Sequence, residues 1–271
     1  MKKLWKYLLI ILAFVFIKKS MGTLAAIIAL LLGIAFILWN RRVIITTQIA
    51  SNAYFIKHNV EKAARLYEKA YKSGEMPANC KVNYSSFCLR EGDIKKAKRL
   101  LTEVINSRFS KETDKISAKH NLAVVLWREG DLNEAINMID SVHNKAKSTS
   151  TYGTYGVLLL ERAKQEDGED VLPFMLEAYE YNEDDKTIAD NLGELYYIKG
   201  EYEKAVPIYE KLVVKPLDTP VPFYNYARVL KALDKKEEAA QMLKTALEKT
   251  FTKVITITRE DVEAELKNLS M

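Results

Sequence analysis

The 271-residue sequence contains few of the residues on which most catalytic and metal sites depend. It has three histidines and two cysteines, with no CxxC pair and no two histidines at ligand spacing. Phosphate-cradling loops of the GxGxxG or GKS/GKT type are absent. The acidic stretches EDGED (166–170) and NEDD (182–185) lack the alternating ligands and central glycine of a calcium loop. These absences predict a protein without catalytic activity, metal or other cofactor.

Disulfides are not expected either. If Cys80 and Cys88 lie on one helix, their eight-residue separation places them about 12 Å apart. A disulfide needs a Cα separation of about 5.5 Å. The two cysteines are therefore predicted to be free thiols, which favours a reducing compartment.

Acidic residues are missing from residues 1–43, which hold seven basic ones. Two apolar runs fill this segment, Leu4–Ile17 and Met21–Trp39. As a helix, the second run is roughly 28 Å long and matches a hydrocarbon core of about 30 Å, whereas the first is only about 21 Å long. We predict a membrane anchor in the lipid bilayer, formed by a hairpin of two transmembrane helices at about 4–17 and 21–39.

Basic residues beside these runs predict the side of the membrane. Five flank the outer ends of the hairpin and two lie in its turn, so the positive-inside rule places both ends, and the rest of the chain, in the cytoplasm. The alternative is a single span by the second run, which puts the rest of the chain outside. A cleaved leader is a further alternative, but FVFIKK offers no small-residue cleavage site. The five are Lys2, Lys3, Lys6, Arg41 and Arg42, and the two are Lys18 and Lys19.

The net charge of +5 does not indicate a nucleic-acid partner. Residues 151–271 hold sixteen basic and twenty-four acidic side chains, and this half would repel phosphate. The basic stretch KKAKR (95–99) has no aromatic residues among its lysines and arginine to stack on bases. It is better interpreted as the charged outer face of a helix.

A repeated pattern organises the remaining chain. REGDIKKAKRLLTEV (90–104), REGDLNEAINMIDSV (128–142) and GEYEKAVPIYEKL (200–212) share a glycine turn followed by an alanine and an apolar stripe. The spacing from Ala205 to Ala239 is 34 residues, as is that from Pro173 to Pro207. A period of 34 is the tetratricopeptide spacing, with two helices per repeat. It predicts about six helix pairs over residues 44–250, with both prolines in the second turn of a second helix.

The copy ADNLGELYYIKGEYEKAVPIYEKLVVKP (189–216) resembles the tetratricopeptide repeat family. The resemblance implies an all-α solenoid over residues 44–250, and residues 251–271 then form a linker and a C-terminal capping helix. In that segment TREDVEAELKNL (258–269) has Thr258 as its N-cap, and KVITIT (253–258) has no pairing partner as a strand and is predicted to be a linker. The residues that match the motif, or lie within one position of it, are Leu192, Gly193, Tyr196, Gly200, Tyr202, Ala205, Tyr209 and Pro216.

The resemblance also implies a binding surface on the concave face, lined by the first helix of each pair. Four asparagines occupy equivalent sites on these helices and are candidates to bind the backbone of a peptide, with an acidic and a basic residue one turn further on. The alternative is that the amides cap or bridge neighbouring helices. The candidates are Asn83, Asn121, Asn191, Asn225, Glu194 and Arg228.

Together these features predict a non-catalytic, membrane-anchored scaffold or adaptor of bacterial type that binds protein or peptide partners. The same solenoid, exposed outside the membrane on one anchor helix and acting in envelope assembly, is the second interpretation. An enzyme with an unrecognised site is the third.

Overall fold

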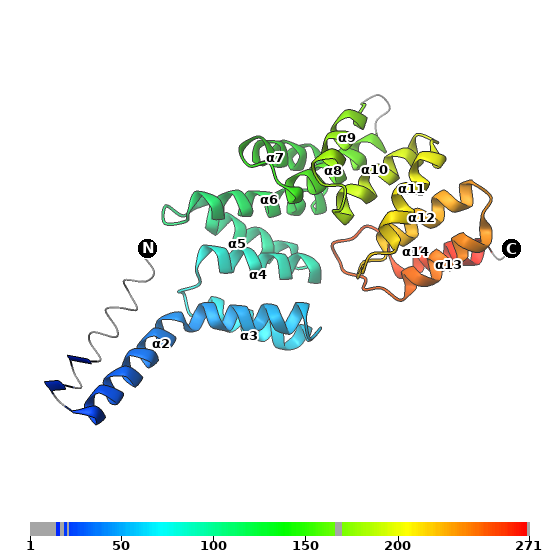
Figure 1. The fold of residues 1–271 in the computed structure, drawn as a ribbon. Coiled ribbons are helices and arrows are strands. Elements are labelled where there is room, and N and C mark those ends of the chain that lie inside the picture. The colour runs from blue at the N-terminus through cyan, green and yellow to red at the C-terminus, as the bar shows by residue number, and fades with distance from the viewer. Residues whose placement is uncertain (1–14, 17–18, 21, 166–169, 270–271) are drawn as a thin grey trace. The chain divides into compact units, whose positions relative to one another are not determined.

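The structure, a computed structural model, describes residues 15–16, 19–20, 22–165 and 170–269. Within these ranges the chain is α-helical with short connections and has no β-strand, which confirms the predicted all-α class (Figure 1). It divides into two compact units, residues 1–80 and residues 81–271. Of the first apolar run, 4–17, the structure describes only residues 15–16. The two-helix hairpin therefore stays a prediction.

Unit 1 is built on one long helix, α2 (Thr23–Phe55), followed by α3 (Val60–Lys72). The second apolar run and the first helix of the predicted first pair are therefore one continuous helix, and the predicted boundary at residue 43 falls inside it. The C-terminal part of α2 buries Val43, Thr47 and Ala50, which recur every three to four residues and so face α3.

The N-terminal part of α2 has a different surface. Its leucines, isoleucines, Phe36 and Trp39 are exposed almost all round, including Leu31 at 60% and Trp39 at 66%. Among the described residues, α2 is the one helix long and apolar enough to cross a membrane. A signal sequence near the N-terminus meets the same criteria of length and composition.

Unit 2 contains the remaining helices, α4 beginning at the boundary between the units (Figure 1). From α4 to α13 they alternate as the first and second members of predicted pairs, and short turns join α4 to α5, α6 to α7, α10 to α11 and α12 to α13. In order they are α4 (Ala78–Glu91), α5 (Ile94–Asn106), α6 (Glu112–Arg128), α7 (Leu132–Lys145), α8 (Thr149–Ala163), α9 (Leu172–Tyr181), α10 (Lys186–Ile198), α11 (Tyr202–Val213), α12 (Val221–Ala232), α13 (Lys236–Leu247) and α14 (Arg259–Leu269).

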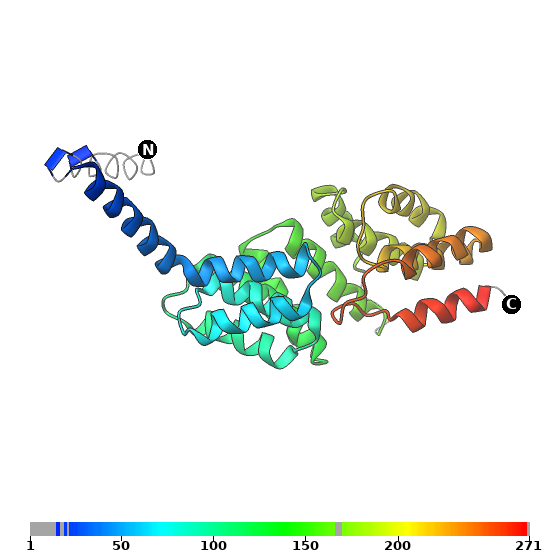
Figure 2. The same cartoon turned by 90° about the horizontal axis from the view of Figure 1, so that it is seen from below.

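Two kinds of packing generate a solenoid from these pairs. Within unit 2, second helices pack on the first helix of the following pair, α5 on α6, α7 on α8, α9 on α10 and α11 on α12. First helices also pack on one another, α6 on α8, α8 on α10 and α10 on α12 (Figure 2). Each repeat thus buries its apolar face on its neighbours, as in a one-dimensional array.

The glycine turns of the motif have a backbone reason. Gly92, Gly130 and Gly200 have φ values of 83°, 93° and 73°, a left-handed conformation that costs glycine little. In the first two turns the glycine is followed by Asp93 or Asp131. The side chain of this aspartate accepts a hydrogen bond from the backbone N–H of the third residue of the second helix. The sequence GD therefore ends one helix and starts the next.

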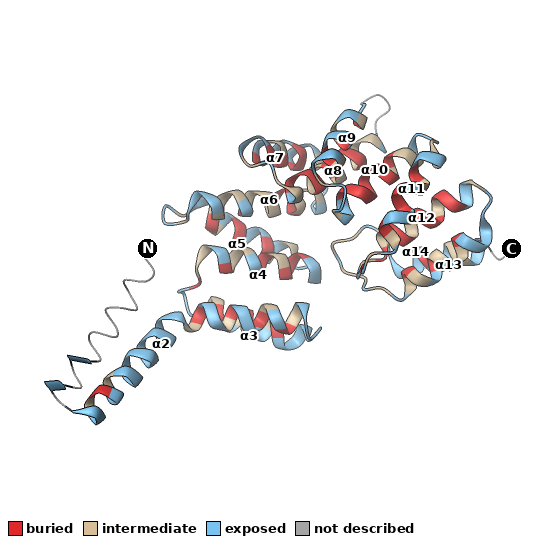
Figure 3. Ribbon diagram, in the orientation of Figure 1, coloured by how far each residue is buried: buried red, intermediate tan, exposed pale blue. Residues whose placement is uncertain are grey.

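Small residues let the paired helices approach closely. The alanines of the repeated motif are completely buried, and Figure 3 marks buried segments along these helices in red. At Gly193 an added Cβ would lie 2.7 Å from ring carbons of Tyr209, the buried tyrosine of the paired helix. The alanines are Ala63, Ala97, Ala135, Ala205 and Ala239.

The two prolines are not equivalent. Pro207 lies inside α11, five residues after its first residue, as predicted. Pro173 is the second residue of α9, so the prediction that it lies in a second turn is wrong. At this position its missing N–H has no intrahelical partner to lose, so it initiates the helix and does not interrupt it.

The C-terminal segment follows the prediction. The Thr258 hydroxyl accepts a bond from Asp261 N at 3.1 Å, and the Asp261 carboxylate accepts from Thr258 N at 2.7 Å, so both cap α14. Val262 is completely buried, and Leu266 and Leu269 also pack on the core. Residues 253–258 contain turns and bends but no strand, as predicted for a linker.

Candidate functional site

A cavity of about 300 Å³ lies in unit 2 against the first helices α8, α10 and α12. Its apolar lining includes Trp127 of α6 together with Val157 and Leu160 of α8. Its polar lining comes mainly from α10 and α12. The segment 254–257, which follows α13, forms the remaining wall. A small, mostly apolar cavity with a few converging polar groups is the usual form of a ligand site.

The structure brings four of the six candidate residues to this cavity. Asn191 and Glu194 lie on α10, Asn225 and Arg228 lie on α12, and all four line it. Asn121 of α6 and Asn83 of α4 are not among its lining residues.

The amides of three candidate asparagines bond between helices. Asn191 Nδ2 donates to the backbone oxygen of Gly153 on α8 at 2.9 Å, and both the side chain and the bond are buried. Asn225 Nδ2 donates to Asp190 on α10 at 3.2 Å. Asn121 Nδ2 donates to the Ser86 hydroxyl on α4 at 2.9 Å. Each therefore bridges its helix to the preceding first helix, whereas Asn83 is exposed.

An ion-pair network crosses the cavity from α8 to α12. Lys164 Nζ lies 2.8 Å from Glu161 and 2.9 Å from Glu194, and Glu194 lies 3.6 Å from an Arg228 nitrogen. Burial alone would lower the pKa of Lys164, but the two carboxylates outweigh it and hold that pKa above its usual value. Arg228 also stacks on Tyr197, 4.3 Å from the ring centroid.

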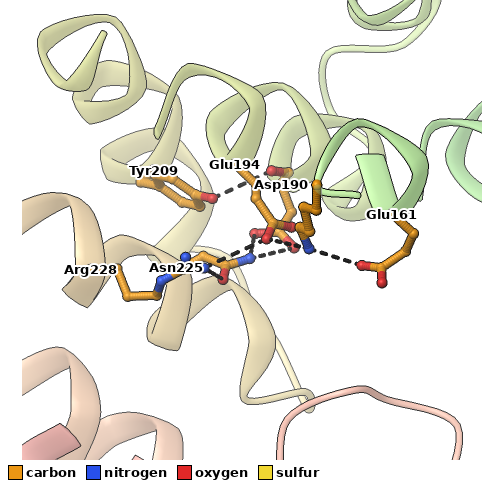
Figure 4. A network of polar contacts seen from close by, with 7 residues as sticks. Glu161, Asp190, Glu194, Tyr209, Asn225 and Arg228 are labelled. Atoms are coloured by element: carbon orange, nitrogen blue, oxygen red, sulfur yellow. Dashed lines mark hydrogen bonds and ion pairs between the residues drawn. The ribbon is translucent and has the colours of Figure 1, made fainter. Parts of the chain in front are cut away.

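Asp190 is the carboxylate at the buried side of this network (Figure 4). Burial and the neighbouring charge of Glu194 raise its pKa from 3.8 to about 7, although the hydrogen bond from Asn225 and the charge of Lys164 act in the opposite direction. The Tyr209 hydroxyl donates to the backbone oxygen of the same residue at 3.3 Å. In Figure 4 the side chains of Glu194, Asn225 and Arg228 converge on Asp190.

The charges of this network do not balance. Lys164 and Arg228 are its two cations that contact carboxylates, and Glu161 and Glu194 are the carboxylates that they contact. Asp190 accepts its side-chain bond from the neutral amide of Asn225. The exposed Lys186, one turn earlier on α10, also lines the cavity. With Asp190 ionised, the buried part of the network has one more carboxylate than cations.

The sequence did not single out Asp190, Lys164 or the segment 254–257. Asp190 precedes the candidate Asn191 and is, in the sequence, only one more residue of the motif copy. In the sequence, Asp190 is marked only as a charged residue next to an apolar position of a first helix. Charged residues at such positions are equally common on the surface. Lys164 falls in the copy that departs most from the motif.

Chemical groups for catalysis or metal binding do not converge here. No cluster of three or more histidine, cysteine, aspartate or glutamate side chains suited to a metal occurs within the part of the chain that the structure describes. Cys80 and Cys88 are both buried free thiols. The arrangement around the cavity can offer hydrogen bonds, charges and apolar contacts to a bound segment.

Unit 2 is a solenoid of helix pairs whose first helices line one face. Residues 188–220 match the family model of the tetratricopeptide repeat. The match covers α10, α11 and the connection to α12, where the cavity residues Asp190, Asn191 and Glu194 lie. Residues 188–220 therefore form a tetratricopeptide repeat, and the helix pairs of unit 2 have the fold of such repeats.

Solved structures share the fold at low sequence identity. TTC0263, a thermophilic TPR protein of Thermus thermophilus, is 15% identical with a TM-score of 0.58, over 71% of this chain and 98% of its own. PilF of Pseudomonas aeruginosa is 14% identical with a TM-score of 0.55, over 84% of this chain and 98% of its own. No curated protein sequence matches the chain.

Proposed function

We propose that the protein is a non-catalytic scaffold held in a membrane by its N-terminal segment, which binds a protein or peptide partner in the groove formed by α8, α10 and α12. The observation that carries this proposal is the cavity on the first-helix face of a tetratricopeptide fold, with Glu194 and Arg228 at its polar side. Such grooves receive extended or helical segments of other proteins.

The candidate residues divide into two roles under this proposal. Glu194 and Arg228 contact the partner, since they are only partly buried, at 14% and 29% side-chain exposure. Asn191 and Asn225 position the helices that carry them, because their amides are buried and bonded between helices. Asn83 and Asn121 extend the same row toward the N-terminal repeats.

The membrane part of the proposal is supported by the end of the apolar surface on α2. The Arg42 guanidinium lies 4.5 Å from the Trp39 ring centroid and also pairs with Glu75 near the end of unit 1. Tryptophan and arginine are enriched where a transmembrane helix leaves the hydrocarbon. The bilayer therefore ends near residue 40, and the repeats begin on the same helix.

Partner binding is tested by affinity purification of the tagged full-length protein from detergent-solubilised membranes. The variant Glu194→Gln/Arg228→Ala is expected to lose specifically captured proteins. Lys211→Ala is the matched control, because Lys211 pairs with Glu183 on the surface of a second helix. Capture of the same proteins by all three forms would refute binding in this groove.

The proposed topology is the cytoplasmic one, with the hairpin and both chain ends inside. It is tested with Cys80 and Cys88 replaced by alanine and with Lys244→Cys, an exposed position on α13. A membrane-impermeant maleimide is expected to label this cysteine only after the cells are lysed. Labelling of intact cells would instead support a single span with the repeats outside.

A further inference from the structure

The segment Phe251–Thr258, called the strap below, follows an unusual path between α13 and α14 (the orange-red loop of Figure 1). Lys253 N donates to the backbone oxygen of Arg90 at 2.9 Å, and the Arg128 guanidinium donates to the Lys253 oxygen at 3.1 Å. These two residues end α4 and α6, far from the strap in sequence. The strap therefore leaves the last helix pair, reaches the ends of two earlier first helices and returns to α14.

The strap covers the proposed groove without filling it. Residues 254–257 line the cavity opposite α8, α10 and α12, and about 300 Å³ stays open between them. Val254, Ile255 and Ile257 are only half-buried. Because an unfilled apolar space forfeits the contacts that its lining atoms would make, this occupant fits its site poorly.

The strap has few backbone hydrogen bonds along its length, although Phe251 and Ile257 pack against the core. Its backbone is bonded at Lys253 and at the Thr258 cap of α14. Between them, the backbone N–H groups of Val254, Thr256 and Ile257 donate no hydrogen bond to any other described residue. Its consecutive β-branched residues, 254–258, favour an extended conformation, yet within the described chain no strand pairs with it.

We infer that the strap is a built-in occupant of the groove and that the partner is an extended peptide segment rich in β-branched or larger apolar residues, which displaces it. This inference rests on the proposed function. A partner with the same backbone path and a bulkier side chain would fill the open volume next to Trp127 and Leu160.

The charges around the cavity indicate that the partner segment is not acidic. Lys164 and Arg228 are already paired with carboxylates, and Asp190 forms its side-chain bond with a neutral amide. An acidic segment would face Asp190 and Glu194 while both cations of the buried network are engaged by other carboxylates. The partner segment is therefore uncharged or basic where it enters the cavity.

The experiment uses the full-length protein in detergent micelles and a fluorescent peptide with blocked ends and the strap sequence FTKVITIT. In the variant Val254→Ser/Ile255→Ser/Ile257→Ser the strap no longer occupies the groove. Thr256→Ser is the matched control, because Thr256 is exposed in the same segment. Fluorescence anisotropy measures binding, and circular dichroism melting measures folding.

The peptide is expected to bind the triple variant at least tenfold more tightly than wild type or Thr256→Ser. The reason is that a tethered competitor acts at an effective concentration of about 1 mM. A peptide with Phe in place of the residue corresponding to Val254 should bind several-fold more tightly still, and one with Asp at both Ile positions should not bind.

Equal affinity for wild type and the triple variant would overturn the inference, as would absence of binding by a variant that still melts cooperatively. If the triple variant does not fold, Ile255→Ser alone is measured in the same way. The proposed function is tested separately, by the affinity purification described above. It fails if wild type and the Glu194→Gln/Arg228→Ala variant capture the same proteins. Partner capture that depends on those two residues, without peptide binding, would leave the scaffold function standing and remove only the strap inference.

Discussion

The side-chain amide of Asn225 on α12 lies 3.2 Å from a carboxylate oxygen of Asp190 on α10. This bond joins two consecutive first helices at the buried side of the cavity. Because the amide is neutral, it satisfies one acceptor site without neutralising the charge. The bond therefore holds a carboxylate in a place where ionisation is costly.

The first prediction is a pH dependence of stability caused by Asp190. Its pKa is about 7 in the folded chain and 3.8 in the unfolded one, so the folded state holds the proton more tightly. Its contribution is fully present below pH 4 and is lost as the pH rises to 7, at about 1.4 kcal/mol per pH unit. Asp190→Asn removes this slope.

The measurement is urea unfolding of wild type and Asp190→Asn at pH 5, 6, 7 and 8. The difference between the two free energies of unfolding should move in favour of the variant from pH 5 to 7 and then level off. Parallel pH profiles for the two proteins would contradict a raised pKa at this site.

A second prediction concerns the close approach of α10 and α11. Gly193→Ala places a Cβ 2.7 Å from Tyr209, whose ring is buried and cannot move freely, so the variant should lose about 1–3 kcal/mol of stability. Gly153→Ala is the matched control, since the nearest atoms to its Cβ would be those of the Thr187 side chain at 3.3 Å. The melting temperature of Gly193→Ala should be well below that of Gly153→Ala. The opposite order would show that α10 and α11 do not pack closely at Gly193.

A third prediction separates structural from exposed asparagines. Asn191→Ala leaves the buried Gly153 oxygen without its donor and should cost about 1–3 kcal/mol. Asn83→Ala changes an exposed side chain at the equivalent repeat position and should stay within about 0.5 kcal/mol of wild type. Chemical denaturation of both variants provides the comparison. Equal losses would mean that burial does not distinguish the two sites.

A fourth prediction tests the anchor. Leu31 is 60% exposed in the middle of the apolar part of α2, and arginine at the centre of a transmembrane helix costs about 2.5–3.5 kcal/mol. Leu31→Arg should therefore increase the fraction of protein released from membranes by an alkaline wash, whereas Leu31→Phe should not. Complete release of wild type under the same wash would show that α2 is not an anchor.

Much of the fold was predictable because the same residue pattern recurs in successive helix pairs. The repeated motif placed the alanines, with Ala205 and Ala239 34 residues apart, and the GD turns placed the starts of α5 and α7. Pro173 was misplaced because its copy lacks the alanine that sets the register elsewhere. A proline alone is compatible with either the first or the second turn of a helix.

The cavity was less predictable because it depends on contacts between distant segments. Asn191 and Asn225 of the predicted row line the cavity, but the atoms to which they bond depend on how the helices stack. The strap reaches Arg90 and Arg128 through backbone groups, which every residue carries and no side-chain pattern marks. The raised pKa of Asp190 likewise follows from burial, which its neighbours in sequence do not reveal.

The continuity of α2 has a mechanical consequence. The helix runs without a break from its exposed apolar part to Ala50 and Ala53, which are buried in unit 1, and at about 1.5 Å per residue its 33 residues form a rod of about 50 Å. A continuous helix has no hinge, so α3 moves together with the apolar part of α2. With α2 anchored in a bilayer as proposed above, a change in lipid thickness that tilts the helix would turn α3 with it. Under that proposal, the membrane sets the orientation of the first repeat.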